Sequence, residues 1–150
     1  MAPSGRVELL LVEDNPDDVE LTLHTLEDFN FTDRIHVARD GAEALDFIFR
    51  RAPYAGRNMD PPRVILLDIK LPKVDGLEVL RQLKADPATR LIPVVMLTSS
   101  QEERDLVESY RLGVNSYITK PVSFDQFVAA VRSLGTYWLL LNKHPSSHAA

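Results

Sequence analysis

The sequence of 150 residues contains no cysteine. This absence excludes disulfide bonds, thiolate metal sites and cysteine nucleophiles, and it gives no sign of an oxidising compartment. No apolar run approaches the roughly 20 residues that are needed to cross a bilayer. The first six residues lack the apolar segment of a signal peptide, so the cytoplasm is the expected location.

Basic residues are fewer than acidic ones. The chain has 17 Lys and Arg against 22 Asp and Glu, which gives a net charge of −5 at pH 7. Non-specific binding to nucleic acid or to an anionic membrane needs a basic field, so neither is an expected partner. The composition is otherwise that of an ordinary globular protein, and the length predicts one domain.

Short apolar segments alternate with amphipathic ones along the chain. Strands are predicted at 7–12, 34–38, 64–67, 92–97 and 116–119, and each is followed by a helical pattern. Helix starts are predicted at Asn15, Asp40, Asp75, Ser100 and Ser123, the last two as capping boxes with Glu103 and Gln126. This repeat predicts an α/β fold, a doubly wound five-stranded parallel sheet, in the flavodoxin-like order 2-1-3-4-5.

Apolar residues at helical spacing predict which helix faces are buried. In the fourth helix, Leu106, Val107 and Tyr110 are expected to point inward. In the last helix the expected inward stripe is Phe124, Phe127, Val128, Val131 and Leu134.

Polar residues follow the carboxyl ends of four predicted strands. They are Glu13 with Asp14, then Asp68, Thr98, and Lys120 with Pro121. Ligands bind at this edge of a doubly wound sheet. Each residue alone is ordinary for a strand end, but the four together predict a binding site.

The charges of these side chains indicate the chemistry of that site. Three carboxylates and one ammonium leave a charge of −2. Hard oxygen ligands without His or Cys favour Mg²⁺. A hydroxyl and an ammonium suit phosphate oxygens, and a carboxylate is a competent nucleophile for phosphoryl transfer. The sequence therefore predicts a magnesium-dependent site for an acyl phosphate.

These residues resemble the receiver domains of two-component response regulators. The similarity covers residues 7 to about 135, and it is carried in order by Glu13-Asp14, Asp68 with Pro72 and Asp75-Gly76, Thr98-Ser99, and Tyr117 to Pro121. The glutamate at position 13, where aspartate is commoner, is the one small departure from the pattern.

The resemblance implies a role for each of these residues. Asp68 would accept a phosphoryl group from a sensor histidine kinase, and Thr98 and Lys120 would bind that group. Asp14, Asp68 and the backbone carbonyl of Lys70 would hold Mg²⁺, with Glu13 on a metal-bound water. Tyr117 would be the aromatic switch whose rotamer reports phosphorylation, together with Thr98, and the Lys120–Pro121 peptide would be cis.

A second resemblance is to the stand-alone regulators that serve phytochrome-type sensor kinases. It rests on the extended loop before Arg63 and on a tail rich in Tyr, Trp and Leu. No DNA-binding output domain is expected, and the protein would not be an enzyme beyond its own phosphorylation and slow dephosphorylation. Output would then be dimerisation, partner binding or onward transfer to a histidine phosphotransfer domain.

The tail from Tyr137 to Leu141 is apolar on every helix face. Exposed patches of this kind mark interfaces, so a homodimer is predicted with Trp138 and Leu141 as contacts. The alternative is that the tail folds back over its own domain. The predicted single domain, 1–150, thus has a core at 7–135, a helix to about 143 and a disordered tail at 144–150.

Several readings remain as alternatives. A hydrolase of the haloacid-dehalogenase type would use the same aspartate, but Lys70 stands where its second acid is expected. An interaction module without phosphorylation is disfavoured because the acceptor set is complete. The 50–62 loop is either solvated or a docking surface for an acidic partner, because it is flanked and crossed by four arginines, Arg50, Arg51, Arg57 and Arg63. His24 and His36 are expected to be packing or surface residues.

Overall fold

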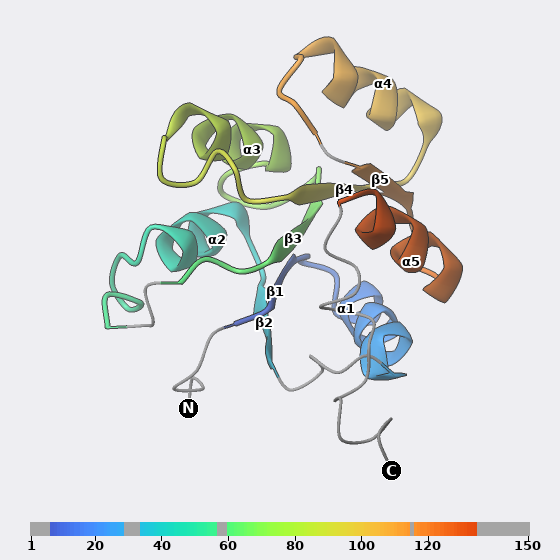
Figure 1. Ribbon diagram of the computed structural model, residues 1–150, viewed down its shortest axis with the longest axis horizontal. Coiled ribbons are helices and arrows are strands. Elements are labelled where there is room, and N and C mark those ends of the chain that lie inside the picture. The colour runs from blue at the N-terminus through green and yellow to red at the C-terminus, as the bar shows by residue number, and fades with distance from the viewer. Residues whose placement is uncertain (1–6, 29–33, 57–59, 115, 135–150) are drawn as a thin grey trace.

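The computed structural model describes residues 7–28, 34–56, 60–114 and 116–134 (Figure 1). The strands are β1 (Leu9–Val12), β2 (Ile35–Ala38), β3 (Val64–Asp68), β4 (Val94–Thr98) and β5 (Ser116–Thr119). The helices are α1 (Pro16–Thr25), η1 (Leu26–Asp28), α2 (Gly41–Ile48), α3 (Gly76–Ala85), α4 (Gln101–Ser109) and α5 (Phe124–Ser133). All strand pairs are parallel and the order is β2-β1-β3-β4-β5, which confirms the predicted fold class.

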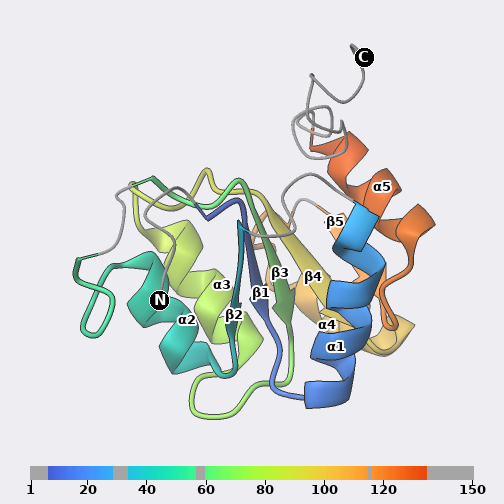
Figure 2. The same cartoon turned by 90° about the horizontal axis from the view of Figure 1, so that it is seen from below.

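Helices cover both faces of the sheet. Figures 1 and 2 show α2, α3 and α4 on one face and α1 and α5 on the other. Side chains alternate between these faces along each strand, so that Leu10 and Ile65 join one apolar cluster while Leu9 and Leu66 join the other. Coverage on both faces explains why the central strands are continuous apolar runs.

Side-chain caps begin the five α-helices where the sequence predicts them. Asn15, Asp40, Asp75, Ser100 and Ser123 each accept a backbone N–H of the first turn. The return bonds of the two predicted capping boxes differ from the expectation. The Glu103 carboxylate accepts from Ser99 N–H at 2.6 Å, and the Gln126 amide bonds Thr119, the last residue of β5, and Pro121.

Three predicted inward side chains are exposed, so that part of the prediction is wrong. Leu106 is 46% exposed, Tyr110 58% and Phe124 50%. Their neighbours Val107 and Phe127 are fully buried. Helical spacing identifies an apolar stripe, but the width that is covered depends on the elements beside the helix, and α4 and α5 lie over the β4–β5 end of the sheet.

Two of the predicted basic residues have acidic partners within the chain. Arg63 is paired with the buried carboxylate of Glu8, and Arg51 lies 3.8 Å from Asp46. Arg57 lies outside the described residues. The loop therefore has less free positive charge than its composition indicates.

The two histidines in question behave as predicted. His24 is 78% exposed and pairs with Glu27 at 3.4 Å. His36 stacks on Phe47 with ring centroids 4.2 Å apart. Within the described ranges no helix combines the length and the apolar character that crossing a membrane requires.

Candidate functional site

The topology brings the predicted polar residues to one edge of the sheet. Asp68 and Thr98 are the last residues of β3 and β4, and Lys120 directly follows β5. Glu13 and Asp14 follow β1, and the strands run in the same direction toward this edge (Figure 2). Glu13, Asp68 and Thr98 are buried, whereas Asp14 is exposed. The cluster thus has buried groups and one carboxylate open to solvent.

Lys120 is the cation of this cluster. Its Nζ lies 3.1 Å from Asp68 Oδ2 and 3.3 Å from Glu13 Oε1. A third carboxylate, Asp18 Oδ2, lies at 3.3 Å as well. Asp18 was not predicted as a site residue, because an acid in a first helical turn is fully explained by the helix dipole. The signal in the sequence is positional: α1 starts at Pro16, two residues after Asp14, so the first turn of the helix lies at the same edge.

Burial and neighbouring charges shift the pKa values of Glu13 and Lys120. Burial, followed by the neighbouring Asp68, raises the pKa of Glu13 from 4.5 to about 7, although Lys120 acts against this. Burial by itself lowers the pKa of Lys120, but Asp68 and Glu13 outweigh it and raise the pKa above its usual value. Lys120 therefore remains charged, and the acids are in excess of the cation.

The acid cluster fits a hard divalent cation. Glu13, Asp14 and Asp68 each offer one oxygen, and these atoms lie within 4.8 Å of one another. The set contains only oxygen, which Mg²⁺ prefers. The three carboxyl groups outnumber the Lys120 ammonium that contacts the cluster, so a bound cation would balance their charge. The Lys70 side chain turns away and pairs with Glu103 at 3.5 Å, so only its backbone is a candidate ligand.

The loop after Asp68 is held by backbone contacts. Asp68 Oδ1 accepts the Ile69 N–H at 2.8 Å, and Gly76 N–H donates to the Ile69 carbonyl at 2.7 Å. Gly41 N–H donates to the Pro72 carbonyl at 3.3 Å. One oxygen of Asp68 is therefore fixed by the backbone and the other faces Lys120.

Tyr117 lies outside the acid cluster, on the α4 side of the sheet. It is half-buried against the apolar cluster of that face, and the Arg104 guanidinium lies 4.6 Å from its ring centroid. Burial, with a smaller effect of Glu108, raises the pKa of Tyr117. The Lys120–Pro121 peptide is cis, as expected. Trp138 and Leu141 lie outside the described residues.

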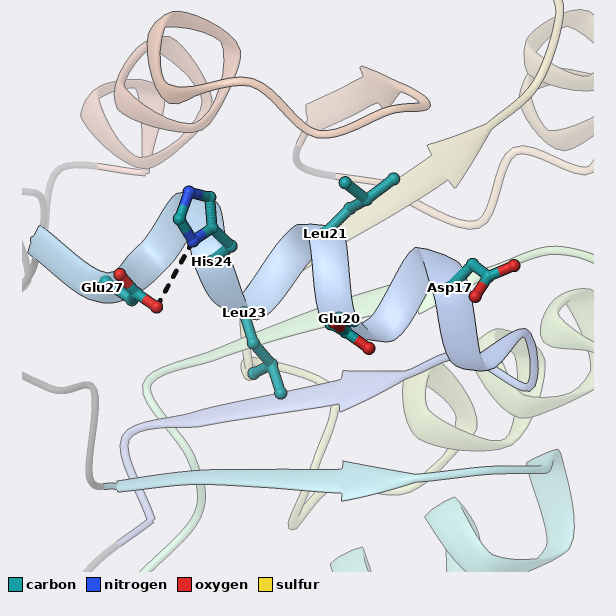
Figure 3. A pocket seen from close by; sticks show the side chains of 6 residues that line it. All are labelled: Asp17, Glu20, Leu21, Leu23, His24 and Glu27. Atoms are coloured by element: carbon teal, nitrogen blue, oxygen red, sulfur yellow. Dashed lines mark ion pairs between the residues drawn. The ribbon is translucent and has the colours of Figure 1, made fainter.

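Two hollows differ in their relation to the site. One, of about 560 Å³, runs along α1 and η1 from Asp17 to Glu27, and none of the clustered acids lines it (Figure 3). Another, of about 510 Å³, opens beside Asp14 and is walled by Lys70, Leu77 and Leu106. The acid cluster is therefore approached over partly apolar walls rather than through a deep pocket.

The comparison with protein families decides what this arrangement is. The family of the response regulator receiver domain matches residues 9–132. The chain belongs to this receiver family. Its five-stranded parallel sheet is therefore that of a receiver domain.

Individual receivers resemble the chain over most of its length. The bacteriophytochrome response regulator AtBRR is 53% identical, with a TM-score of 0.83, and the similarity covers 93% of this chain and 99% of that one. The probable methanogenesis regulatory protein FilR2 of Methanothrix harundinacea is 45% identical over 91% of this chain and 86% of its own length. The Mn²⁺-bound form of the response regulator Rcp1 is 37% identical, with a TM-score of 0.68, covering 87% of this chain and 93% of that one.

The raised pKa of Glu13 predicts how stability depends on pH in the metal-free receiver. Glu13 holds a proton more tightly when folded, with a pKa of about 7, than when unfolded, at 4.5. Its contribution is complete below the unfolded pKa and is lost as the pH rises through the folded pKa. We expect the free energy of unfolding in EDTA to fall by about 3 kcal/mol across this window. Urea denaturation of the wild type and Glu13→Gln checks this, because the substitution removes the slope; equal slopes would contradict it.

Proposed function

We propose that the protein is a response regulator that accepts a phosphoryl group on Asp68 from the phosphohistidine of a sensor histidine kinase. The observation that carries the proposal is the buried Asp68 carboxylate, which has Lys120 at 3.1 Å and two further acids beside it. Membership of the receiver family supports this chemistry. Lys70, paired with Glu103, stands where a hydrolase of the dehalogenase type would need its second acid.

The transfer is a displacement at phosphorus. An Asp68 oxygen attacks the phosphorus atom, the P–N bond of phosphohistidine breaks, and the bonding electron pair returns to the imidazole nitrogen. Lys120 moves its ammonium from the carboxylate to a phosphoryl oxygen, and the Thr98 hydroxyl donates to another. The charge at Asp68 changes from −1 to about −2, which is the local signal of the switch.

The acid cluster supplies the metal dependence in this proposal. Glu13, through a water, and Asp14, Asp68 and the Lys70 carbonyl would hold Mg²⁺. When bound, the cation neutralises charge on the phosphoryl oxygens during transfer. The Mn²⁺-bound form of Rcp1 supports a divalent site in this class of receiver.

The signal then passes to the surface through Thr98 and Tyr117. Movement of Tyr117 changes its contact with Arg104 and so the surface of α4, β5 and α5. The similarity to AtBRR favours a phytochrome-type kinase as the donor, whereas FilR2 bears the name of a different regulatory system. Dimerisation, partner binding and onward transfer to a histidine phosphotransfer domain are the outputs that this switch can serve.

Incubation with acetyl phosphate tests the proposal without a cognate kinase. We expect the mass of one phosphoryl group to be added in Mg²⁺ and none in EDTA, and peptide mapping should place it on Asp68. Candidate kinases with labelled ATP, phytochrome-type ones first, then identify the donor. If the wild-type chain takes no label from acetyl phosphate or from any candidate kinase, the proposed function is wrong.

Dimerisation through the C-terminal tail is part of the same proposal. A buried aromatic or leucine side chain is worth roughly 1.5–3 kcal/mol, so a few from each subunit can hold a dimer. Homodimers usually pair identical patches about a twofold axis. We expect a chain cut after Leu134, and a Trp138→Ser/Leu141→Ser double variant, to be monomeric and still accept phosphate.

Light scattering over a concentration series measures this effect. Lys143→Ser, a polar change in the same tail, is the control and should stay dimeric. If the wild type is a monomer with and without phosphate, the tail covers its own domain instead.

A further inference from the structure

The side-chain amide of Gln126 is bonded to the backbone on both sides of Lys120. Its Oε1 accepts the Thr119 N–H at 2.9 Å. Its Nε2 donates to the carbonyls of Thr119, at 3.0 Å, and of Pro121, at 3.2 Å. One side chain of α5 therefore spans the segment from which the Lys120 side chain extends.

The Gln126 amide forms the hydrogen bonds that a further strand beside β5 would form. β5 is an edge strand, with β4 on one side only. The Lys120 N–H donates to the Thr98 carbonyl of β4 at 2.8 Å. Backbone groups of successive residues point to opposite sides of a strand, so Thr119 presents its N–H and C=O to the open side. Gln126 offers one acceptor and one donor there, as a neighbouring peptide group would.

The anchor of Gln126 is rigid. Its own N–H donates to the Ser123 Oγ at 3.2 Å in the first turn of α5. The next residue, Phe127, is fully buried and fixes that turn against the sheet. Lys120 is consequently held by β4 on one side and, through Gln126, by the first turn of α5 on the other.

The position of Lys120 matters because three acids compete for its ammonium. Asp18 lies as close to Nζ as Glu13 does, at 3.3 Å, and Asp68 lies at 3.1 Å. The Asp18 side chain is 32% exposed, so an ammonium that settles on it lies nearer to solvent than one on the buried Asp68. A shift of the backbone at residues 119–121 would change how the ammonium is shared among these three carboxylates.

We infer that Gln126 is a positioning residue for phosphoryl transfer to Asp68. It fixes residues 119–121 so that the Lys120 ammonium stays 3.1 Å from the acceptor Asp68 while it also contacts Glu13 and Asp18. The inference rests on the proposed function. Gln126 touches neither the acceptor nor the phosphoryl donor and acts only through Lys120.

The test compares Gln126→Met with Gln82→Met. Both replace a hydrogen-bonded glutamine by an apolar chain of similar size, but the Gln82 bond, 2.9 Å to Glu78, stays within α3. Initial rates of phosphorylation by acetyl phosphate are measured over a range of Mg²⁺ concentrations. Amide hydrogen exchange at Thr119 is followed by NMR in the same proteins.

We expect Gln126→Met to lower the maximum rate roughly tenfold, since displacement of a catalytic group by a fraction of an ångström is costly. The Mg²⁺ concentration for half-maximal rate should stay at the wild-type value, and Thr119 exchange should be faster. Gln126→Glu keeps the acceptor for Thr119 and should give an intermediate rate. Gln82→Met should behave as the wild type.

A double variant separates positioning from general destabilisation. If Gln126 acts through Lys120, the double variant Gln126→Met/Lys120→Met should be phosphorylated no more slowly than Lys120→Met alone. The inference is overturned if Gln126→Met keeps the wild-type maximum rate or the wild-type exchange rate at Thr119. It is also overturned if the double variant is slower than Lys120→Met. Absence of label in the wild type would instead refute the proposed function itself.

Discussion

Asp68→Asn is expected to lose all labelling by acetyl phosphate and by the kinase while it keeps the fold. An amide is not a nucleophile at phosphorus, yet Asn has the size of Asp. Its Oδ1 can still accept the Ile69 N–H, which Asp68 Oδ1 binds at 2.8 Å. The amide NH₂ would face the Lys120 ammonium, donor against donor, so the ion pair at 3.1 Å is lost. Loss of the nucleophile is expected to cost on the order of a thousandfold or more in rate.

Mass spectrometry measures the label, and circular dichroism checks the fold. Asp75→Asn is the matched control, because Asp75 is an acid of the same loop that caps α3, a role that Asn fills as well. It should be labelled at the wild-type rate. Full labelling of Asp68→Asn would show that the acceptor is another residue.

Gly76→Ala is expected to destabilise the protein by about 3 kcal/mol or more. A Cβ at this position would lie 2.0 Å from the Asp68 carbonyl oxygen and 2.8 Å from Ile69 Cα. Both atoms belong to the backbone at the end of β3, so they cannot rotate away as a side chain could. The strand end must shift, and the acceptor carboxylate shifts with it.

Urea denaturation measures this loss of stability, and acetyl phosphate labelling measures the shift of the acceptor. Gly56→Ala provides the comparison, because nothing lies within 4 Å of a Cβ added there. Its stability should change by no more than about 0.5 kcal/mol. Equal stability of the two variants would show that the strand end can give way at little cost.

The fold and most of the acid cluster could be predicted from the sequence. Continuous apolar runs such as Val64–Leu67 indicate strands that are covered on both faces, and their alternation with helices leaves few topologies. In a parallel sheet the carboxyl ends meet at one edge. The convergence of Glu13, Asp68 and Lys120 therefore follows from connectivity alone, without knowledge of any side-chain conformation.

The contacts that sequence reasoning missed depend on where side chains reach. Gln126 has the spacing of a capping box with Ser123, but its amide bonds Thr119 and Pro121 because an edge strand leaves those groups open. Asp18 has the position of an acid that the dipole of α1 favours, and helical spacing alone does not place the first turn of α1 beside Lys120. Leu106 fits an amphipathic stripe, yet nothing in the spacing says that only Val107 of α4 is buried.

That shallow attachment of α4 has a thermodynamic consequence. With Val107 as the one buried residue of its nine, α4 exposes little apolar surface when it moves, so the free energy of displacing it is small. Two positions of such a helix need differ by no more than a few kcal/mol in free energy, and a bound group shifts their populations by as much as it favours one of them. The Lys70–Glu103 pair at 3.5 Å connects α4 to the loop after Asp68. In the proposed switch, a change of charge at Asp68 would therefore act on a helix that one buried side chain, Val107, holds to the sheet.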